Sequence, residues 1–261
     1  EEAARAGAHL LIIGERGVGK KTFARYYHHI STGARQPYVE ISLAEVAPAA
    51  VEATLFGVEA DPANPQEEGQ TGLLETIGDG TLAIVHAERL DIHQQRLLLT
   101  YLTHGWYWRQ HGRQAHQGQT RLVLVATGSE AEVMGRLIPD LWEALAGRRV
   151  VVPPLTQRLR DIPLLAKHFL GLDAKQSGRR ARLLSREAED RLVSYGWPGN
   201  LRELENVMQR AAIVASEDTI VAPDLIFVAP PEKEVHKLNL LRNEKLRTFL
   251  RRSRLLTVLT W

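Results

Sequence analysis

Residues 14–20 constrain the fold of this 261-residue chain more than any other part of its sequence. They read Gly-Glu-Arg-Gly-Val-Gly-Lys and directly follow an apolar run at residues 9–13. A short apolar run that ends at glycine predicts a buried parallel strand, and residues 20–30 predict a helix. Strand, glycine-rich turn and helix in this order form the phosphate-loop pattern G-x-x-x-x-G-K. Its glycines let backbone N–H groups point at phosphate oxygens, and its lysine reaches the phosphates.

The position after this lysine departs from the pattern. A Ser or Thr that helps to hold Mg²⁺ usually stands there, whereas this chain has Lys21 and places Thr22 one residue later. The alternative is a glycine turn that only starts a helix, but the strand before it and the helix after it favour phosphate binding. The residues expected to surround the nucleotide are Gly14, Glu15, Arg16, Gly17, Val18, Gly19, Lys20, Lys21 and Thr22.

Strand and helix patterns alternate over the first part of the chain, which predicts an α/β fold with a parallel sheet. Further strands are expected at residues 38–42, 81–85, 106–108, 121–127 and 149–152, and helices at 43–56 and 90–102. After Pro153 and Pro154 only helices are expected, at residues 161–170, 185–195, 200–215 and 222–226, with Ser185 and Asn200 as caps. The predicted domains are an α/β nucleotide-binding domain at 1–157, a small all-α domain at 158–229 and a basic tail at 230–261.

Composition excludes some classes of protein. The chain has no Cys, so it can form neither disulfides nor thiolate metal sites. No secretory signal is expected at its start, and the missing initiator Met suggests a piece of a longer protein. The net charge of +2 is uneven, because residues 235–261 carry seven Lys or Arg and one acid, which leaves the rest mildly acidic. The basic pI therefore says nothing about nucleic acid binding by the body of the chain.

Several short motifs in register resemble one family, the central AAA+ domain of the bacterial enhancer-binding proteins that activate sigma-54 RNA polymerase. The resemblance runs over about residues 10–227. Its landmarks are the phosphate loop, Leu55-Phe56-Gly57, Gly80-Thr81-Leu82, Pro153-Pro154-Leu155, Arg158, Asp161-Ile162-Pro163 and the string Trp-Pro-Gly-Asn-Leu-Arg-Glu-Leu-Glu-Asn at residues 197–206. It implies a P-loop AAA+ fold with a parallel sheet flanked by helices, followed by a small all-α lid. It also implies ATP or ADP as ligand, ring oligomers, a cytoplasmic protein, and phosphate sensing by Arg202 of the lid.

The departures from the family lie in the segments that contact sigma-54, bind the metal and position the attacking water. Leu-Phe-Gly leads there into a GAFTGA loop that touches sigma-54, but residues 58–71 of this chain are acidic, contain proline and lack that loop. The family's Walker B strand closes with Asp-Glu, for the metal and the attacking water, and in register these positions hold Val85 and His86. Neither offers the oxygen ligand that Mg²⁺ prefers. Glu88 lies two residues further on, where the chain should have left the strand.

Two arginines that act in trans in the family are also replaced. Their positions hold Ile138 and Ala144, and the sensor-one pair Thr-Asn is here Thr127-Gly128. Such an arginine contributes about 10³–10⁵ to the rate, which is roughly 4–7 kcal/mol of barrier. The nearby Arg148 and Arg149 are the alternative sources of this charge.

The interpretation of this pattern is a degenerate member that binds ATP or ADP as a regulatory or scaffold module, with Mg²⁺ in doubt and no catalytic residue left. The alternatives are an active ATPase that remodels a protein partner with substitute residues, and an assembly module that binds no nucleotide. Expected partners are further copies in a ring and an unknown protein. No direct DNA contact is expected, because no helix-turn-helix is visible. The tail either leads to a membrane segment or packs as a helix on protein.

Histidines gather in two places. His104, His111 and His116, with Trp106 and Trp108, lie in a polar segment with no carboxylate nearby in sequence, so solvated loop histidines are expected rather than a metal site. His28 and His29 close the first helix, where a structural role is expected.

Overall fold

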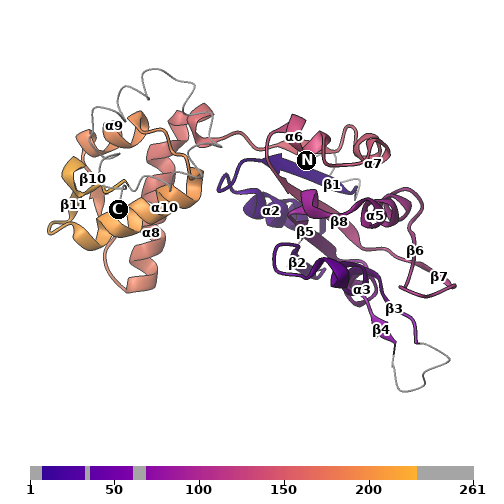
Figure 1. Ribbon diagram of the computed structural model, residues 1–261. Coiled ribbons are helices and arrows are strands. Elements are labelled where there is room, and N and C mark those ends of the chain that lie inside the picture. Colours follow the sequence, from indigo (N-terminus) through magenta and orange to yellow (C-terminus); the bar gives the residue numbers. More distant parts are fainter. Residues whose placement is uncertain (1–7, 33–35, 61–68, 228–261) are drawn as a thin grey trace, which may run out of the picture. The chain divides into compact units, whose positions relative to one another are not determined.

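A computed structural model describes residues 8–32, 36–60 and 69–227 of the chain (Figure 1). The chain divides into two compact units between Val152 and Pro153, whereas the sequence predicted a boundary at 157/158. Leu155 explains the difference, because its side chain is fully buried in the core of the second unit. The linker prolines therefore lead straight into the second unit.

The first unit is built on a five-stranded sheet in which all strands are parallel, as predicted. Its order is β2-β5-β8-β1-β9. The strands are β1 (Leu10–Gly14), β2 (Tyr38–Ser42), β5 (Thr81–Val85), β8 (Arg121–Thr127) and β9 (Arg149–Val151). Gly14 at the end of β1 lies opposite Thr127 at the end of β8. The carboxyl ends of the strands therefore share one edge of the sheet, which is the edge where ligands of open α/β sheets bind.

Alternate side chains of the strands enter two hydrophobic cores, one on each face of the sheet. Leu10 and Ile12 of β1 pack with Ala24 and Tyr27 of α2 (Lys20–Thr32). The other face packs against five helices: α3 (Val51–Phe56), α4 (Leu73–Ile77), α5 (Ile92–His104), α6 (Glu130–Met134) and α7 (Pro139–Ala144). The inner strands β1, β5 and β8 are buried on both faces and are nearly continuous apolar runs, whereas the edge strands β2 and β9 are partly exposed.

The long helix predicted at 43–56 was wrong in its first half. Only η1 (Pro48–Ala50) and α3 are helical there. The N–H of Leu43 donates to Val85 at the end of β5, and the N–H of Glu45 donates back to Ser42, so the chain turns after β2. The helix predicted from residue 90 begins at Ile92 because Asp91 caps it, with its side chain accepting the N–H of Gln94.

Two antiparallel hairpins extend the first unit beyond the sheet (Figure 1). One joins β3 (Gly57–Val58) to β4 (Gln70–Thr71), and the other joins β6 (Trp106–Trp108) to β7 (Ala115–Gln117). Gln110 connects them, because its N–H donates to Gly57 and its carbonyl accepts the N–H of Glu59. The hairpin predicted at Trp106–Trp108 is confirmed, and the backbone bonds join it to the first hairpin.

The second unit has its own core, formed by α8 (Ile162–Ser177), α9 (Arg186–Ser194) and α10 (Asn200–Val214) around Trp197. Three short 3-10 turns complete it: η3 (Leu155–Gln157), η4 (Leu159–Asp161) and η5 (Ala222–Asp224). The prediction of helices alone was incomplete, because β10 (Leu183–Leu184) and β11 (Thr219–Ile220) form a small parallel pair. Ser185 caps α9 as expected, with its hydroxyl accepting the N–H of Ala188.

Asn200 does not cap α10, contrary to the prediction. Gly199 occupies the cap position, and the Asn200 side chain accepts the N–H of Leu155 at 2.7 Å instead. Asn200 has a φ of 51°, in the left-handed region that asparagine tolerates better than most residues. The Trp-Pro-Gly-Asn turn therefore ties the first residues of the second unit to the start of α10.

The expectations for the tail at 230–261 concern residues outside the described part of the chain. Among the residues that the structure describes, no helix has the length and the apolar character needed to cross a bilayer.

Candidate nucleotide site

The phosphate loop lies where the sequence predicted it, between the end of β1 and the start of α2. Gly17 and Gly19 have φ values of 81° and 98°, in the left-handed region where glycine carries no steric cost. Between them Val18 turns its side chain into the core next to α2, with 1% of its surface exposed. Glycine at both positions therefore lets the loop turn on either side of the buried valine without steric strain.

Lys20 is buried at the base of this loop, with 8% of its surface exposed. Its Nζ donates to the carbonyl oxygens of Gly14 and Glu15, both at 2.7 Å. Burial lowers the pKa of Lys20 to about 8, although the negative charges of Glu88 and Glu15 act in the opposite direction. A buried ammonium whose hydrogen bonds go to carbonyl oxygens is well prepared for an anionic ligand.

Lys21 and Thr22 are both exposed, and Lys21 has a partner away from the loop. Its Nζ lies 2.6 Å from the Glu40 carboxylate on β2, and Arg25 of α2 lies 3.6 Å from the same carboxylate. Lys21 therefore forms an ion pair with the neighbouring edge strand, at the position where a metal-binding hydroxyl would stand.

Val85 and His86, at the positions of the family's metal and water acids, end β5 without a carboxylate. Val85 is 4% exposed and belongs to the core on the α2 side of the sheet. His86 follows with a φ of 63°, so the backbone makes a left-handed turn at a residue other than glycine. Such backbone conformations are rare and concentrate at functional sites.

The left-handed turn at His86 brings Glu88 back to the edge of the sheet. The chain leaves the strand as expected and enters η2 (Ala87–Arg89), but the Glu88 side chain is only 6% exposed. One carboxylate oxygen accepts the N–H of Thr127 at 3.0 Å, and the other lies 3.1 Å from Nδ1 of His86. Sequence reasoning missed this placement, because no local pattern signals a left-handed histidine.

The sensor-one residues follow the same edge. Thr127 ends β8 opposite Gly14, and the N–H of Gly128 donates to the carbonyl of Gly14 at 3.2 Å. Gly128 has a φ of 139°, which side chains rarely adopt, and a Cβ there would lie 3.0 Å from Glu132. The backbone at this position thus favours the glycine that replaces the family's asparagine.

The two positions of the lost arginines lie at either end of α7. Ile138 precedes the helix and packs against the core, and its N–H donates to the side chain of Gln95 at 2.7 Å. Ala144 is exposed at the helix end. Of the alternative arginines, Arg149 stacks its guanidinium over Trp142 at 4.0 Å, and Arg148 is exposed. Because its guanidinium is stacked on Trp142, Arg149 is not a freely projecting charge.

Arg202 lies on α10 of the second unit, with its side chain exposed. In the described part of the chain it forms no ion pair with Glu203 or Glu205. The carboxylate of Glu203 instead accepts the N–H of Gly199 at 2.8 Å and the hydroxyl of Tyr195 at 2.9 Å.

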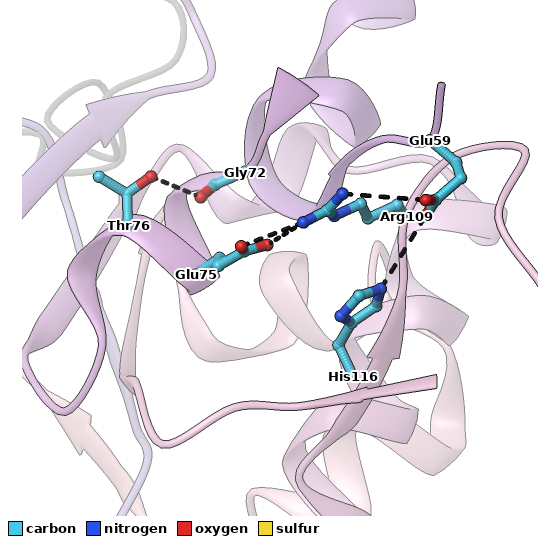
Figure 2. Close-up of polar contacts among 6 residues, drawn as sticks. All are labelled: Glu59, Gly72, Glu75, Thr76, Arg109 and His116. Carbon is cyan, nitrogen blue, oxygen red and sulfur yellow. Dashed lines mark hydrogen bonds and ion pairs between the residues drawn. The ribbon is translucent and has the colours of Figure 1, made fainter. Parts of the chain in front are cut away.

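The histidine-rich hairpin differs from its prediction, because carboxylates do lie beside it. Figure 2 shows Arg109 between Glu75 and Glu59, with His116 facing Glu59. Nη2 of Arg109 donates to both oxygens of Glu75, at 3.0 and 2.8 Å, and Nη1 lies 4.0 Å from Glu59. Nε2 of His116 lies 4.0 Å from Glu59, and its ring stacks on Tyr107.

These acids come from outside the hairpin, from the segment after β3 and from α4, where Thr76 also binds the carbonyl of Gly72 (Figure 2). His104 and His111 are exposed as expected. His28 is structural, since its Nδ1 lies 2.9 Å from the hydroxyl of Thr81 in a buried position, and burial lowers its pKa.

Among the described residues, no group of three or more His, Asp or Glu side chains is placed so that it could hold a metal ion. A Mg²⁺ ion in nucleotide sites needs only one or two carboxylates, because phosphates and water supply its other ligands. Glu88 offers a carboxylate at the phosphate-loop edge with one hydrogen-bond partner on each oxygen, which leaves lone pairs for a water or an ion.

The chain matches two family models. Residues 1–149 match the sigma-54 interaction domain, and residues 156–237 match the AAA+ ATPase lid domain. Among curated proteins, it is 34% identical to the transcriptional regulatory protein XylR of Pseudomonas putida over 87% of this chain and 40% of that protein. It is 32% identical to the transcriptional regulator NtrC of Escherichia coli over 85% of this chain and 48% of that protein. The chain thus spans less than half the length of these relatives.

Solved structures of NtrX from Brucella abortus have the same fold. The structure in complex with ADP gives a TM-score of 0.75 at 26% identity, over 94% of this chain and 57% of that chain. The structure in complex with ATP gives 0.75 at 27% identity, over 94% of this chain and 56% of that chain. The AAA+ fold with its helical lid, expected from the sequence, is therefore confirmed. With its family-model matches, its relatives and its phosphate loop, the chain belongs to the sigma-54 interaction domain family of AAA+ transcription regulators.

Proposed function

We propose that this chain is an ATP- or ADP-binding regulatory or scaffold module of a sigma-54-type transcription regulator, and that it does not hydrolyse its nucleotide. One contrast carries the proposal. The phosphate loop keeps its glycines and a buried Lys20, whereas Val85 and His86 stand where hydrolysis needs two carboxylates. The module thus holds phosphates without aiming a water molecule at them.

Binding is supported by the electrostatics of the loop. Lys20 is buried and bound to two carbonyl oxygens, and an anionic ligand would offer it stronger partners. The NtrX structures with ADP and ATP come from a chain of the same fold. The proposed contacts are the loop residues 14–22 and, from the lid, Arg202.

The proposed loss of hydrolysis follows from three replacements: those of the metal-binding acid, of the two arginines and of a sensor-one residue. Val85 is buried in the core and carries no ligand atom. Ile138 and Ala144 replace arginines whose contribution to the rate is about 10³–10⁵ in comparable enzymes. Gly128 replaces the polar sensor-one residue. Even if one function were recovered by a neighbour, the others would keep the barrier high.

The proposed binding partners also follow from the differences between this chain and the family. Residues 58–71 lack the family's sigma-54 loop, so contact with sigma-54 in the family's manner is not proposed. Further copies of the chain and a protein yet to be identified are the proposed partners, without direct DNA contact by this segment. The proposed location is the cytoplasm, and the basic tail at 230–261 is proposed either to approach a membrane segment or to pack as a helix on protein.

One observation favours a second function, that of an active ATPase with substitute residues. The carboxylate of Glu88 lies at the phosphate-loop edge and acts on the charge of Lys20. Both of its oxygens already have hydrogen-bond partners, which argues against a free general base. The two functions predict different rates of phosphate release.

Calorimetric titration with ATP and with ADP tests the proposed binding. We expect heat and a raised unfolding temperature with both nucleotides, and neither effect in the Lys20→Ala variant. Arg202→Ala should weaken binding without abolishing it. A chain that shows no heat and no thermal shift would be an assembly module, and the proposal would be wrong.

A further inference from the structure

Val85 and His86 replace the two Walker B acids, but Glu88 brings a carboxylate to the same edge of the sheet. It does not come from the strand itself but from η2, after the left-handed turn at His86. Its side chain is 6% exposed, which is unusual for a carboxylate. A buried carboxylate next to a phosphate loop needs a compensating positive charge, and the loop lysine provides part of it.

Two contacts fix the position of this carboxylate, one from Thr127 and one from His86, and the first places it at the shared edge of β5, β8 and β1. Thr127, which donates its N–H to Glu88 at 3.0 Å, lies opposite Gly14 in the sheet. Gly14 in turn accepts a hydrogen bond from Lys20 at 2.7 Å. His86 holds the second oxygen at 3.1 Å. The charge of Glu88 also counteracts the lowering of the pKa of Lys20.

We propose that Glu88 takes over one role of the lost carboxylates and is the residue through which Mg²⁺ strengthens ATP binding. This inference rests on the proposed nucleotide binding. A carboxylate beside triphosphate repels it when no metal is present, and attracts a hydrated Mg²⁺ that the phosphates also bind. Glu88 therefore opposes metal-free ATP and favours ATP with Mg²⁺. The lone pairs that Thr127 and His86 leave on its two oxygens would hold the ion or its water ligands.

The test is a ratio: the dissociation constant of ATP measured in EDTA divided by the dissociation constant measured in MgCl₂ for the same protein. We expect a ratio on the order of ten in the unchanged chain, because groups around a metal commonly change its affinity by at least that factor. Glu88→Gln keeps an oxygen to accept the N–H of Thr127 but removes the charge. Its ratio should fall toward one, through tighter binding in EDTA and weaker binding in MgCl₂.

A merely structural Glu88 would give another result, because Glu88→Gln would then change both constants alike and leave the ratio unchanged. Glu143→Gln, on the exposed side of α7, is the matched control and should keep the original ratio. His86→Asn suits the left-handed backbone and removes a competitor for one oxygen of Glu88, so the ratio should rise. This variant decides the question if Glu88→Gln does not fold.

The inference is overturned if the unchanged chain binds ATP equally well in EDTA and MgCl₂, if Glu88→Gln keeps the full ratio, or if His86→Asn lowers it. Each of these results leaves the proposed nucleotide binding intact. Absence of any ATP binding, in EDTA and in MgCl₂, would instead contradict the proposed function itself.

Discussion

Lys20 shows how burial prepares a single residue for an anion. Its ammonium lies among carbonyl oxygens with little access to water, and this environment lowers its pKa to about 8. The cost of keeping the charge is relieved when a phosphate approaches, because the phosphate favours the protonated form. Binding and protonation of Lys20 are therefore linked.

Nucleotide affinity should depend on pH for this reason. Below the pKa of about 8 Lys20 already carries its proton, so affinity should stay nearly constant there. Above that pH the free protein must take up a proton to bind, and affinity should fall by up to about tenfold per pH unit. Titrations from about pH 7 to about pH 9.5 in buffers of different ionisation enthalpy would measure both effects. An affinity that is flat above pH 8, without proton uptake, would contradict the role given to Lys20.

Asn200 makes a residue-scale contribution to the second unit. Its side chain accepts the buried N–H of Leu155 at 2.7 Å, and its backbone is left-handed. Asn200→Ala should reduce the free energy of unfolding by about 2–3 kcal/mol, because it leaves a buried donor unpaired and strains the backbone. Urea unfolding would measure this loss. Asn200→Asp keeps the acceptor and should lose clearly less, and equal losses would contradict this account.

At the scale of elements, the two hairpins of the first unit are joined by backbone bonds at Gln110 and by Arg109, which binds Glu75 of α4 (Figure 2). Arg109 is 19% exposed in its side chain, so its contacts are screened less than those of a surface pair. The hairpins and α4 are thereby held as one assembly, although they come from distant parts of the sequence.

Arg109→Ala should loosen this assembly without affecting the phosphate loop. The expected loss in free energy of unfolding is about 1–2 kcal/mol, above the usual value for an exposed pair, because Glu75 and Glu59 then lack their cation. Amide hydrogen exchange should rise in β3, β6 and β7, while ATP affinity stays unchanged. Arg113→Ala, on the exposed part of the same hairpin, is the control. Exchange that rises equally in both variants would refute the role of Arg109.

At the scale of the whole molecule, the sequence predicted what depends on local pattern. All five strands of the sheet were predicted within about one residue, and the clearest signal came from β1, β5 and β8, whose apolar runs are buried on both faces. The phosphate loop was predicted for the same reason, since strand, glycines and helix are contiguous. The second unit was predicted as helical, but the two-residue strands β10 and β11 are too short to leave a pattern.

The features that could not be predicted depend on long-range placement. Glu88 reaches the site only because His86 adopts a left-handed conformation, and its partner Thr127 belongs to another strand. His116 meets Glu59 only because the two hairpins pair at Gln110. In each case the partners are far apart in sequence, and neither carries a signal of the other.

We propose that the chain holds a nucleotide and does not turn it over. Steady-state phosphate release from the purified chain with Mg²⁺ and ATP tests it most directly. We expect a rate that equals that of the Lys20→Ala variant, in a sample whose ATP binding has been shown by calorimetry. Turnover near one per second, the lower end of ordinary enzymes, that is abolished by Lys20→Ala would contradict it.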